Sequence, residues 1–237
     1  IYNHWEETVA VASDSFETIS LPSMATAMVL YTSGTTGEPK GTVHTHAGFG
    51  TKVAKDLYFD FDFKPDDRLF WITDVGWIMG PWSIIGAHIL GGTISLYSGA
   101  IDTPDRYHLW EFIQRHSVTT LGLSPTAIRV LRDKAVVPAE SYDLTSLRLL
   151  GSTGEPWDEP NWRWFYEKVG DARLPIINVS GGTEAGGHFL APTPIQPMTP
   201  CTVGSPTLGI DVDIVDDQGN SVRAENEEGY LVLKNSF

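Results

Sequence analysis

The stretch Tyr31-Thr32-Ser33-Gly34-Thr35-Thr36-Gly37-Glu38-Pro39-Lys40-Gly41 follows an apolar run at 24–30, which predicts a buried β-strand. Its glycines allow the backbone to turn with positive φ and to approach a ligand closely. Successive N–H groups in such a turn form a concave site for anions, and Lys40 adds a positive charge. The stretch therefore predicts a loop that holds the phosphates of a nucleotide directly after a strand of the fold.

This loop differs from a Walker A loop, in which a glycine and four further residues precede Gly-Lys-Ser/Thr. Here Gly41 follows Lys40, which lies three positions after Gly37. A plain surface loop is the alternative, because clusters of glycine, serine and threonine are common in turns. The length of the stretch, the strand before it and its Pro-Lys-Gly ending favour phosphate binding.

The composition is that of a globular, acidic chain of 237 residues, 41% of them hydrophobic, with a net charge of −14. This charge argues against nucleic acid or an anionic membrane as a partner. Local amides, lysine and a metal ion therefore have to hold any bound polyphosphate. The single cysteine, Cys201, excludes an intrachain disulfide, and the sequence shows neither a signal-peptide pattern nor a run of about 18 apolar residues. We expect a cytoplasmic location.

Predicted strands alternate with predicted helices along most of the chain, which predicts an α/β fold with a mostly parallel sheet and helices on both faces. In such sheets, ligands bind at the carboxyl ends of the strands. The strands are expected at 24–32, 68–73, 93–97, 119–123, 147–150 and 176–179. The helices are expected at 46–59, 81–90, 104–116, 125–133 and 161–168.

Beyond residue 200 the pattern changes to short alternating segments. Residues 210–215 alternate apolar and acidic side chains, 216–220 carry a turn signal, and 229–234 read as another strand. We expect 201–237 to begin a small antiparallel, barrel-like subdomain, after an α/β subdomain at 1–200 whose residues 1–23 are a connector. Because the chain stops within a strand pattern, we interpret it as an internal segment of a longer protein.

Three further motifs follow predicted strands, at 74–80, 154–156 and 180–184. The last contains a Thr-Glu pair, and Mg²⁺ commonly takes one or two carboxylates beside substrate phosphates. Because the carboxyl ends of parallel strands meet at one edge of the sheet, we expect one composite site there. His44 and His46 are interpreted as packing residues, since two histidines without a nearby carboxylate are too few for a metal centre.

With these motifs the chain resembles the AMP-forming acyl-CoA synthetases of the adenylate-forming ligase superfamily, from about residue 24 to its end. The segment Asp74-Val75-Gly76-Trp77 is similar to the acetyl-CoA synthetase-like branch. The resemblance implies that a small-molecule carboxylate attacks ATP to give acyl-AMP and pyrophosphate, after which coenzyme A takes the acyl group. It also implies Mg²⁺ as the metal.

The resemblance further implies a role for each motif residue. Lys40, Thr183 and Glu184 are the implied catalytic residues, with Thr183 on the α-phosphate and Glu184 on Mg²⁺. The implied phosphate loop consists of Thr32, Ser33, Gly34, Thr35, Thr36, Gly37 and Lys40. The implied adenine contacts are Gly154, Glu155, Pro156 and Asn178. The implied acyl pocket consists of Trp77, Ile78, Met79, Thr153 and Gly181.

One motif departs from the pattern of acetate-specific members, which resemble Trp-Trp-Gln before Thr-Glu. Here the residues before Thr183 are Ser180-Gly181-Gly182, so a glycine replaces the tryptophan that closes the acetate pocket. Each methylene that can then be buried contributes about 0.8 kcal/mol. We therefore expect an acyl group larger than acetate, from propionate-sized to medium chain, with Ile78 and Met79 refilling part of the space.

Two features of the resembling family are missing before Phe237: an aspartate for the ribose hydroxyls and a lysine on a C-terminal domain. We expect this segment alone to be inactive or to bind nucleotide weakly. Two alternatives remain open, namely another adenylating enzyme (an aryl-CoA ligase or a peptide-synthetase adenylation domain) and a non-catalytic nucleotide-binding module. The 74–77 segment favours the acyl-CoA synthetases over the first, and Lys40, Thr183 and Glu184 argue against the second.

Overall fold

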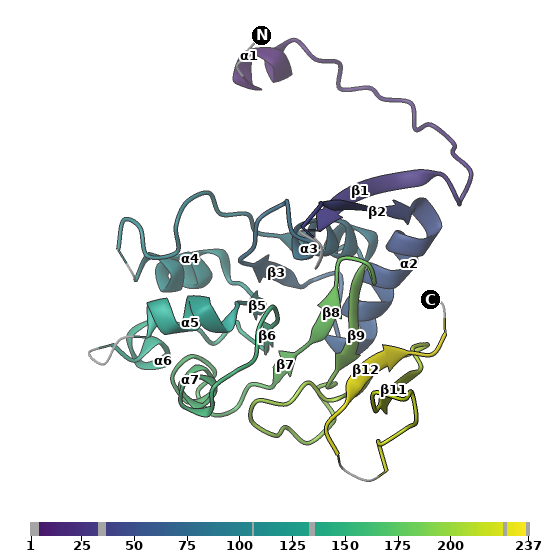
Figure 1. Ribbon diagram of the computed structural model, residues 1–237. Coiled ribbons are helices and arrows are strands. Elements are labelled where there is room, and N and C mark those ends of the chain that lie inside the picture. Colours follow the sequence, from purple (N-terminus) through teal and green to yellow (C-terminus); the bar gives the residue numbers. More distant parts are fainter. Residues whose placement is uncertain (1–4, 33–36, 106, 133–135, 225–226, 236–237) are drawn as a thin grey trace.

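A five-stranded parallel sheet with the strand order β4-β3-β5-β6-β7 forms the centre of the molecule. The computed structural model describes residues 5–32, 37–105, 107–132, 136–224 and 227–235 (Figure 1). The predicted α/β fold with a parallel sheet is thereby confirmed. The strands are β3 (Arg68–Trp71), β4 (Thr93–Ile94), β5 (Thr120–Gly122), β6 (Leu149–Ser152) and β7 (Ile176–Asn178).

Helices cover both faces of this sheet, as predicted, because successive strand side chains point to opposite faces. Leu69 and Trp71 of β3 contribute to one core and Phe70 to the other. The first core includes residues of α2 (His46–Lys55) and α3 (Met79–Ile89). The second core includes residues of α4 (His108–His116), α5 (Pro125–Leu131) and α7 (Glu159–Trp164). Between α5 and α7 in the sequence, α6 (Pro138–Ser141) forms a single short turn. The π-helical turns Asp56–Asp60 and Phe165–Val169 extend α2 and α7.

The strand before the phosphate loop was predicted to be buried, and this is wrong. β1 (Thr26–Thr32) pairs in antiparallel fashion with β2 (Lys40–Thr45), a strand that the sequence did not predict. The hairpin stands outside the parallel sheet, so only one of its faces packs on the core. Met28 and Leu30 lie on that face, whereas Val29 and Tyr31 are 46% and 71% exposed.

The predicted Ser-Gly-Gly-Thr-Glu loop is also partly a strand. β8 (Ser180–Gly182) pairs with β9 (Gly187–Ala191), which pairs in turn with β10 (Ser205–Pro206). Gly181 lies opposite His188 in the register, and Thr183 and Glu184 fall in the tight connection between the strands. The strand pattern beyond residue 200 forms the antiparallel pair β11 (Val212–Val215) and β12 (Tyr230–Leu233).

The ends of several other elements differ from their predictions. The helix expected from Pro104 begins at His108, where α4 starts. Within the expected connector, α1 (Trp5–Ala10) forms a short helix that lies apart from the rest of the molecule (Figure 1). Among the described residues, no helix is both long and apolar enough to cross a bilayer.

Candidate functional site

A cavity of about 490 Å³ opens at the carboxyl ends of the parallel strands, in the place expected for a composite site. Its lining comes from the segments that follow β3, β6 and β7, together with β8 and β9. The cavity brings together predicted residues from three motifs that are far apart in the sequence. These residues are Trp77, Ile78, Met79, Thr153, Gly154, Gly181 and Thr183.

The expected acyl-pocket residues give this cavity an apolar interior and an aromatic entrance. Ile78 and Met79 are each 8% exposed, whereas Trp77 is 70% exposed. A turn fixes these residues at the start of α3. In this turn the Asp74 carboxylate accepts a hydrogen bond from the backbone N–H of Gly76 at 2.7 Å, and the Asp74 carbonyl accepts one from Trp77 at 3.1 Å.

The sequence led us to expect that Gly181, in place of a tryptophan, would leave empty space for the acyl group, but the structure differs at this position. A Cβ atom at this position would overlap the carbonyl oxygen of Gly187 and lie 2.5 Å from the Cα atom of His188. Glycine is therefore required here because the β9 backbone approaches β8 closely. The backbone occupies the direction in which a side chain would leave residue 181, so the missing indole cannot simply be counted as empty space.

Of the predicted phosphate and metal residues that the structure describes, one lies in the wall of this cavity. Thr183 lines it, and the exposed Glu184 lines an adjacent hollow of about 170 Å³ together with His44. His44 is 8% exposed, and burial lowers its pKa. Lys40, predicted to lie in the loop, is instead the exposed first residue of β2. Ser33, Gly34, Thr35 and Thr36 lie outside the described residues, while Thr32 is half-buried and Gly37 is exposed.

Two predicted adenine residues have structural partners instead of facing the cavity. The Glu155 carboxylate accepts hydrogen bonds from the backbone N–H of Thr126 at 2.7 Å and from Arg129 at 3.1 Å, and these lower its pKa, with Thr126 contributing most. Asn178 is 4% exposed, and its amide donates to the carbonyl of Thr202 at 2.9 Å. Pro156 is exposed beside them.

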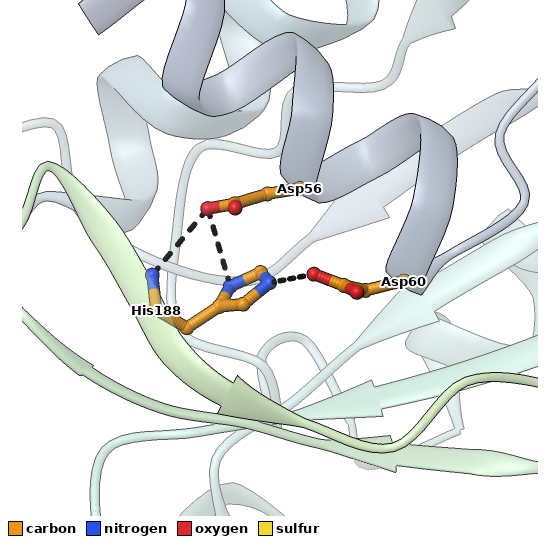
Figure 2. Close-up of side chains that lie close together, drawn as sticks. All are labelled: Asp56, Asp60 and His188. Carbon is orange, nitrogen blue, oxygen red and sulfur yellow. Dashed lines mark hydrogen bonds and ion pairs between the residues drawn. The ribbon is translucent and has the colours of Figure 1, made fainter. Parts of the chain in front are cut away.

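Sequence reasoning missed a buried histidine in the cavity lining, His188, which lies between two buried carboxylates (Figure 2). Its Nε2 atom lies 2.9 Å from an Asp60 oxygen, and its Nδ1 atom lies 3.5 Å from an Asp56 oxygen. All three residues are at most 2% exposed. One feature of the sequence could have indicated a buried charged cluster here. Asp56 and Asp60 lie one helical turn apart, and each is followed by a core residue, Leu57 or Phe61.

Two lysines complete a buried ion-pair network around Asp56. Lys52 Nζ and Lys55 Nζ lie 2.6 Å and 2.7 Å from different oxygens of this carboxylate. Burial raises the pKa of Asp56, but His188, Lys52 and Lys55 outweigh it, so the pKa is lowered overall. Burial also lowers the pKa of Lys52 to about 8.

The spacing of Asp56, Asp60 and His188 would suit a metal ion, since their ligand atoms lie within 4.8 Å of one another. However, both Asp56 oxygens already contact lysine ammonium groups. A cation would have to displace these ammonium groups, so we interpret the cluster as an ion-pair network.

Comparison with known proteins places the sequence among AMP-binding enzymes, the family that it matches over residues 3–237. The acetyl-coenzyme A synthetase of Chlorobaculum tepidum is 39% identical over 232 residues, which are 97% of this chain and 35% of that protein. That of Methanothrix soehngenii is 39% identical over 231 residues, 97% of this chain and 34% of that protein. The chain thus spans about a third of the length of these curated relatives.

Two solved structures share the fold. The acetoacetyl-CoA synthetase from Streptomyces lividans superposes with a TM-score of 0.88 at 31% identity, over 97% of this chain and 35% of that one. An anthranilate CoA ligase in complex with anthranoyl-AMP gives a TM-score of 0.83 at 24% identity, over 97% of this chain and 43% of that one. At this lower identity, the second likeness concerns the fold alone.

Proposed function

The chain belongs to the AMP-binding enzyme family, and on this premise we propose that it forms the nucleotide- and acyl-binding part of an AMP-forming acyl-CoA synthetase. In the first step a substrate carboxylate oxygen attacks the α-phosphorus of ATP, and the bond to pyrophosphate breaks to leave acyl-AMP. In the second step the thiol of coenzyme A attacks the acyl carbonyl, and AMP leaves. The observation that carries the proposal is the single cavity that Thr183 shares with Trp77, Ile78 and Gly181.

Each phosphate contact is proposed for a residue of matching chemistry. Lys40 and the loop amides hold the β- and γ-phosphates, because an ammonium group and N–H donors offset their charge. The Thr183 hydroxyl, at the cavity wall, contacts the α-phosphate. The exposed Glu184 carboxylate beside it is the kind of ligand that Mg²⁺ takes together with phosphate oxygens, so Glu184 holds the metal, which neutralises phosphate charge when bound.

The reaction asks the protein mainly to position the reactants and stabilise developing charge. Substrate carboxylate and polyphosphate repel each other, and the net charge of −14 of the chain repels each of them as well. Local donors therefore have to bring the two reactants together. The apolar interior at Ile78 and Met79 orients the acyl chain while its carboxylate faces Thr183.

We propose that the acyl group is longer than acetate. Gly182 supports this size, because it lines the cavity without a side chain and the nearest atom to an added Cβ would be 3.4 Å away. The acetoacetyl-CoA synthetase among the similar structures adds support, since its name describes a four-carbon acyl group. Because β9 approaches Gly181 closely, the space gained there is limited, and we expect an optimum at short acyl chains, from propionyl upward.

Binding of acyl-sulfamoyl adenosines to the 237-residue chain tests this function without requiring turnover. Isothermal titration with acetyl, propionyl, butyryl and hexanoyl analogues is expected to give tighter binding than AMP, with the optimum beyond acetyl. An acetyl optimum would overturn the size proposal, and a benzoyl optimum would favour an aryl-CoA ligase. Because weak nucleotide binding is expected, the titration extends to the highest soluble ligand concentrations, and absence of binding by AMP and by every analogue there would overturn the function.

A matched pair of variants tests the assignment of Thr183. Thr183→Val keeps the side-chain volume and removes the hydroxyl, so it is expected to weaken AMP binding about tenfold, the size of one lost charge-assisted hydrogen bond. Thr193→Val is the control, because Thr193 is similarly half-buried but does not line the cavity. Equal losses in the two variants would contradict the assignment.

A further inference from the structure

The buried charges of α2 and its π-helical extension hold the backbone and the side chain of His188. Lys52 Nζ donates to the His188 carbonyl at 2.5 Å, and the His188 backbone N–H donates to Asp56 at 3.4 Å. The imidazole Nε2 atom contacts a carboxylate oxygen of Asp60 (Figure 2), at a distance of 2.9 Å. The residue is therefore fixed at three points, and it is 1% exposed.

Only one layer of backbone separates this network from the cavity. Gly181 and His188 are register partners on β8 and β9, and both line the cavity. Gly187 lines it as well, and a Cβ atom at this position would overlap an Asp56 oxygen and lie 3.3 Å from Lys52 Nζ. The network therefore lies directly behind the cavity wall.

We propose that His188 is a positioning residue that sets the depth of the acyl pocket and thereby the acyl length that the site prefers. This inference rests on the proposed function, since it takes the occupant of the cavity to be an acyl group. The charges hold β9, β9 limits the position of Gly181, and Gly181 forms part of the wall. One buried methylene changes affinity about fourfold, so a small shift of this wall changes the length preference.

Two substitutions of His188 separate this role from general stability. The Nε2 atom of glutamine is three bonds from Cβ, as it is in histidine, so His188→Gln can keep the hydrogen bond to Asp60. The amide nitrogen of asparagine is only two bonds from Cβ, so His188→Asn loses it. Asp67→Asn is the matched control, because the 4%-exposed Asp67 is ion-paired with Arg148 at the other end of β3, away from the cavity.

The experiment measures the affinities of the 237-residue chain for AMP and for the acyl-sulfamoyl adenosine series by titration. In the wild-type chain, the best analogue and the next shorter one are expected to differ about fourfold, the worth of one buried methylene. His188→Asn is expected to abolish this ratio and to leave AMP affinity within about twofold. His188→Gln and Asp67→Asn are expected to keep the ratio. If His188→Asn folds poorly, Asp60→Ala can replace it, because it removes the same hydrogen bond. Asp60→Ala is then expected to abolish the same affinity ratio.

The outcomes distinguish failure of this inference from failure of the function. A common loss of affinity for AMP and all analogues in His188→Asn would assign His188 a purely structural role and overturn the inference. A ratio that changes equally in Asp67→Asn, or a wild-type chain that binds AMP without any length preference, would also overturn it. A chain that binds neither AMP nor any analogue overturns the proposed function and the inference together.

Discussion

The two hairpins that carry the nucleotide motifs are anchored to the α2 region in opposite ways. β8–β9, which leads into Thr183 and Glu184, is held by buried charges through His188. β1–β2, which flanks the predicted phosphate loop, rests on the core through one apolar face and exposes Val29 and Tyr31 on the other. The comparison teaches that the proposed acyl wall is organised in advance by the fold, whereas Lys40, the side chain proposed to contact the phosphates, stands exposed.

The largest expected effect tests the anchor of β8–β9. Asp56→Ala is expected to lower the free energy of unfolding by about 3–5 kcal/mol, because removing one partner of a buried ion pair leaves the other charges uncompensated. Urea unfolding followed by circular dichroism measures it. Arg163→Ala is the control, since its pair with Glu159 is exposed and such pairs contribute about 0.3–0.5 kcal/mol. If Asp56→Ala lowers the free energy of unfolding no more than the control does, buried charges do not anchor β8–β9, and the contrast between the two hairpins is wrong.

A glycine in each hairpin gives the next largest contrast. Gly181→Ala is expected to cost about 1–3 kcal/mol, because its methyl group would overlap the β9 backbone, which cannot easily move. In Gly41→Ala on β2, the added Cβ lies 3.3 Å from a methyl group of Val29, an exposed side chain that can shift, so the change is expected within about 0.5 kcal/mol. Thermal unfolding of both variants measures these two losses of stability. Equal losses would show that the two hairpins tolerate an added methyl group equally well.

Low pH is expected to weaken the β8–β9 anchor, but by less than the substitutions described above. Because the pKa of Asp56 is lowered in the folded chain, the unfolded chain takes up this proton first as the pH falls. The stabilisation is complete above the ordinary aspartate pKa of about 3.9 and declines as the pH falls through the folded-state value. Urea unfolding of the wild type between neutral and acidic pH is expected to show this decline, and Asp56→Asn to show a shallower one. Identical slopes would contradict the assignment.

The smallest effect on stability is expected at the phosphate loop. Lys40→Ala removes an exposed side chain, so the free energy of unfolding is expected to change by less than about 0.5 kcal/mol. ATP binding is nevertheless expected to weaken about tenfold or more, as for loss of a hydrogen bond to a charged group. Titration with ATP and with AMP measures this, and AMP is expected to be affected less. A large loss of stability would mean that Lys40 anchors its hairpin.

Local sequence patterns predicted the parallel sheet because each of its strands and helices carries its own periodicity. They also predicted that the motifs at 74–80, 154–156 and 180–184 would meet, since all three follow strand ends, and Trp77, Gly154 and Gly181 do line one cavity. They failed for β2, whose pairing with β1 depends on the loop between them. They failed as well for His188, which meets Asp56 from 132 residues away, because no local pattern encodes a contact over that distance.

The thin partition formed by Gly187 also has a consequence for redesign and for divergence within the family. A side chain introduced there would enter the Lys52–Asp56 pair, so pocket and network substitutions are expected to be strongly non-additive. A library that varies only positions 181 and 187 is expected to sample mostly damaged proteins. A library that varies positions 52, 56, 60 and 188 together with 181 and 187 is expected to contain combinations that change the proposed acyl preference and still fold.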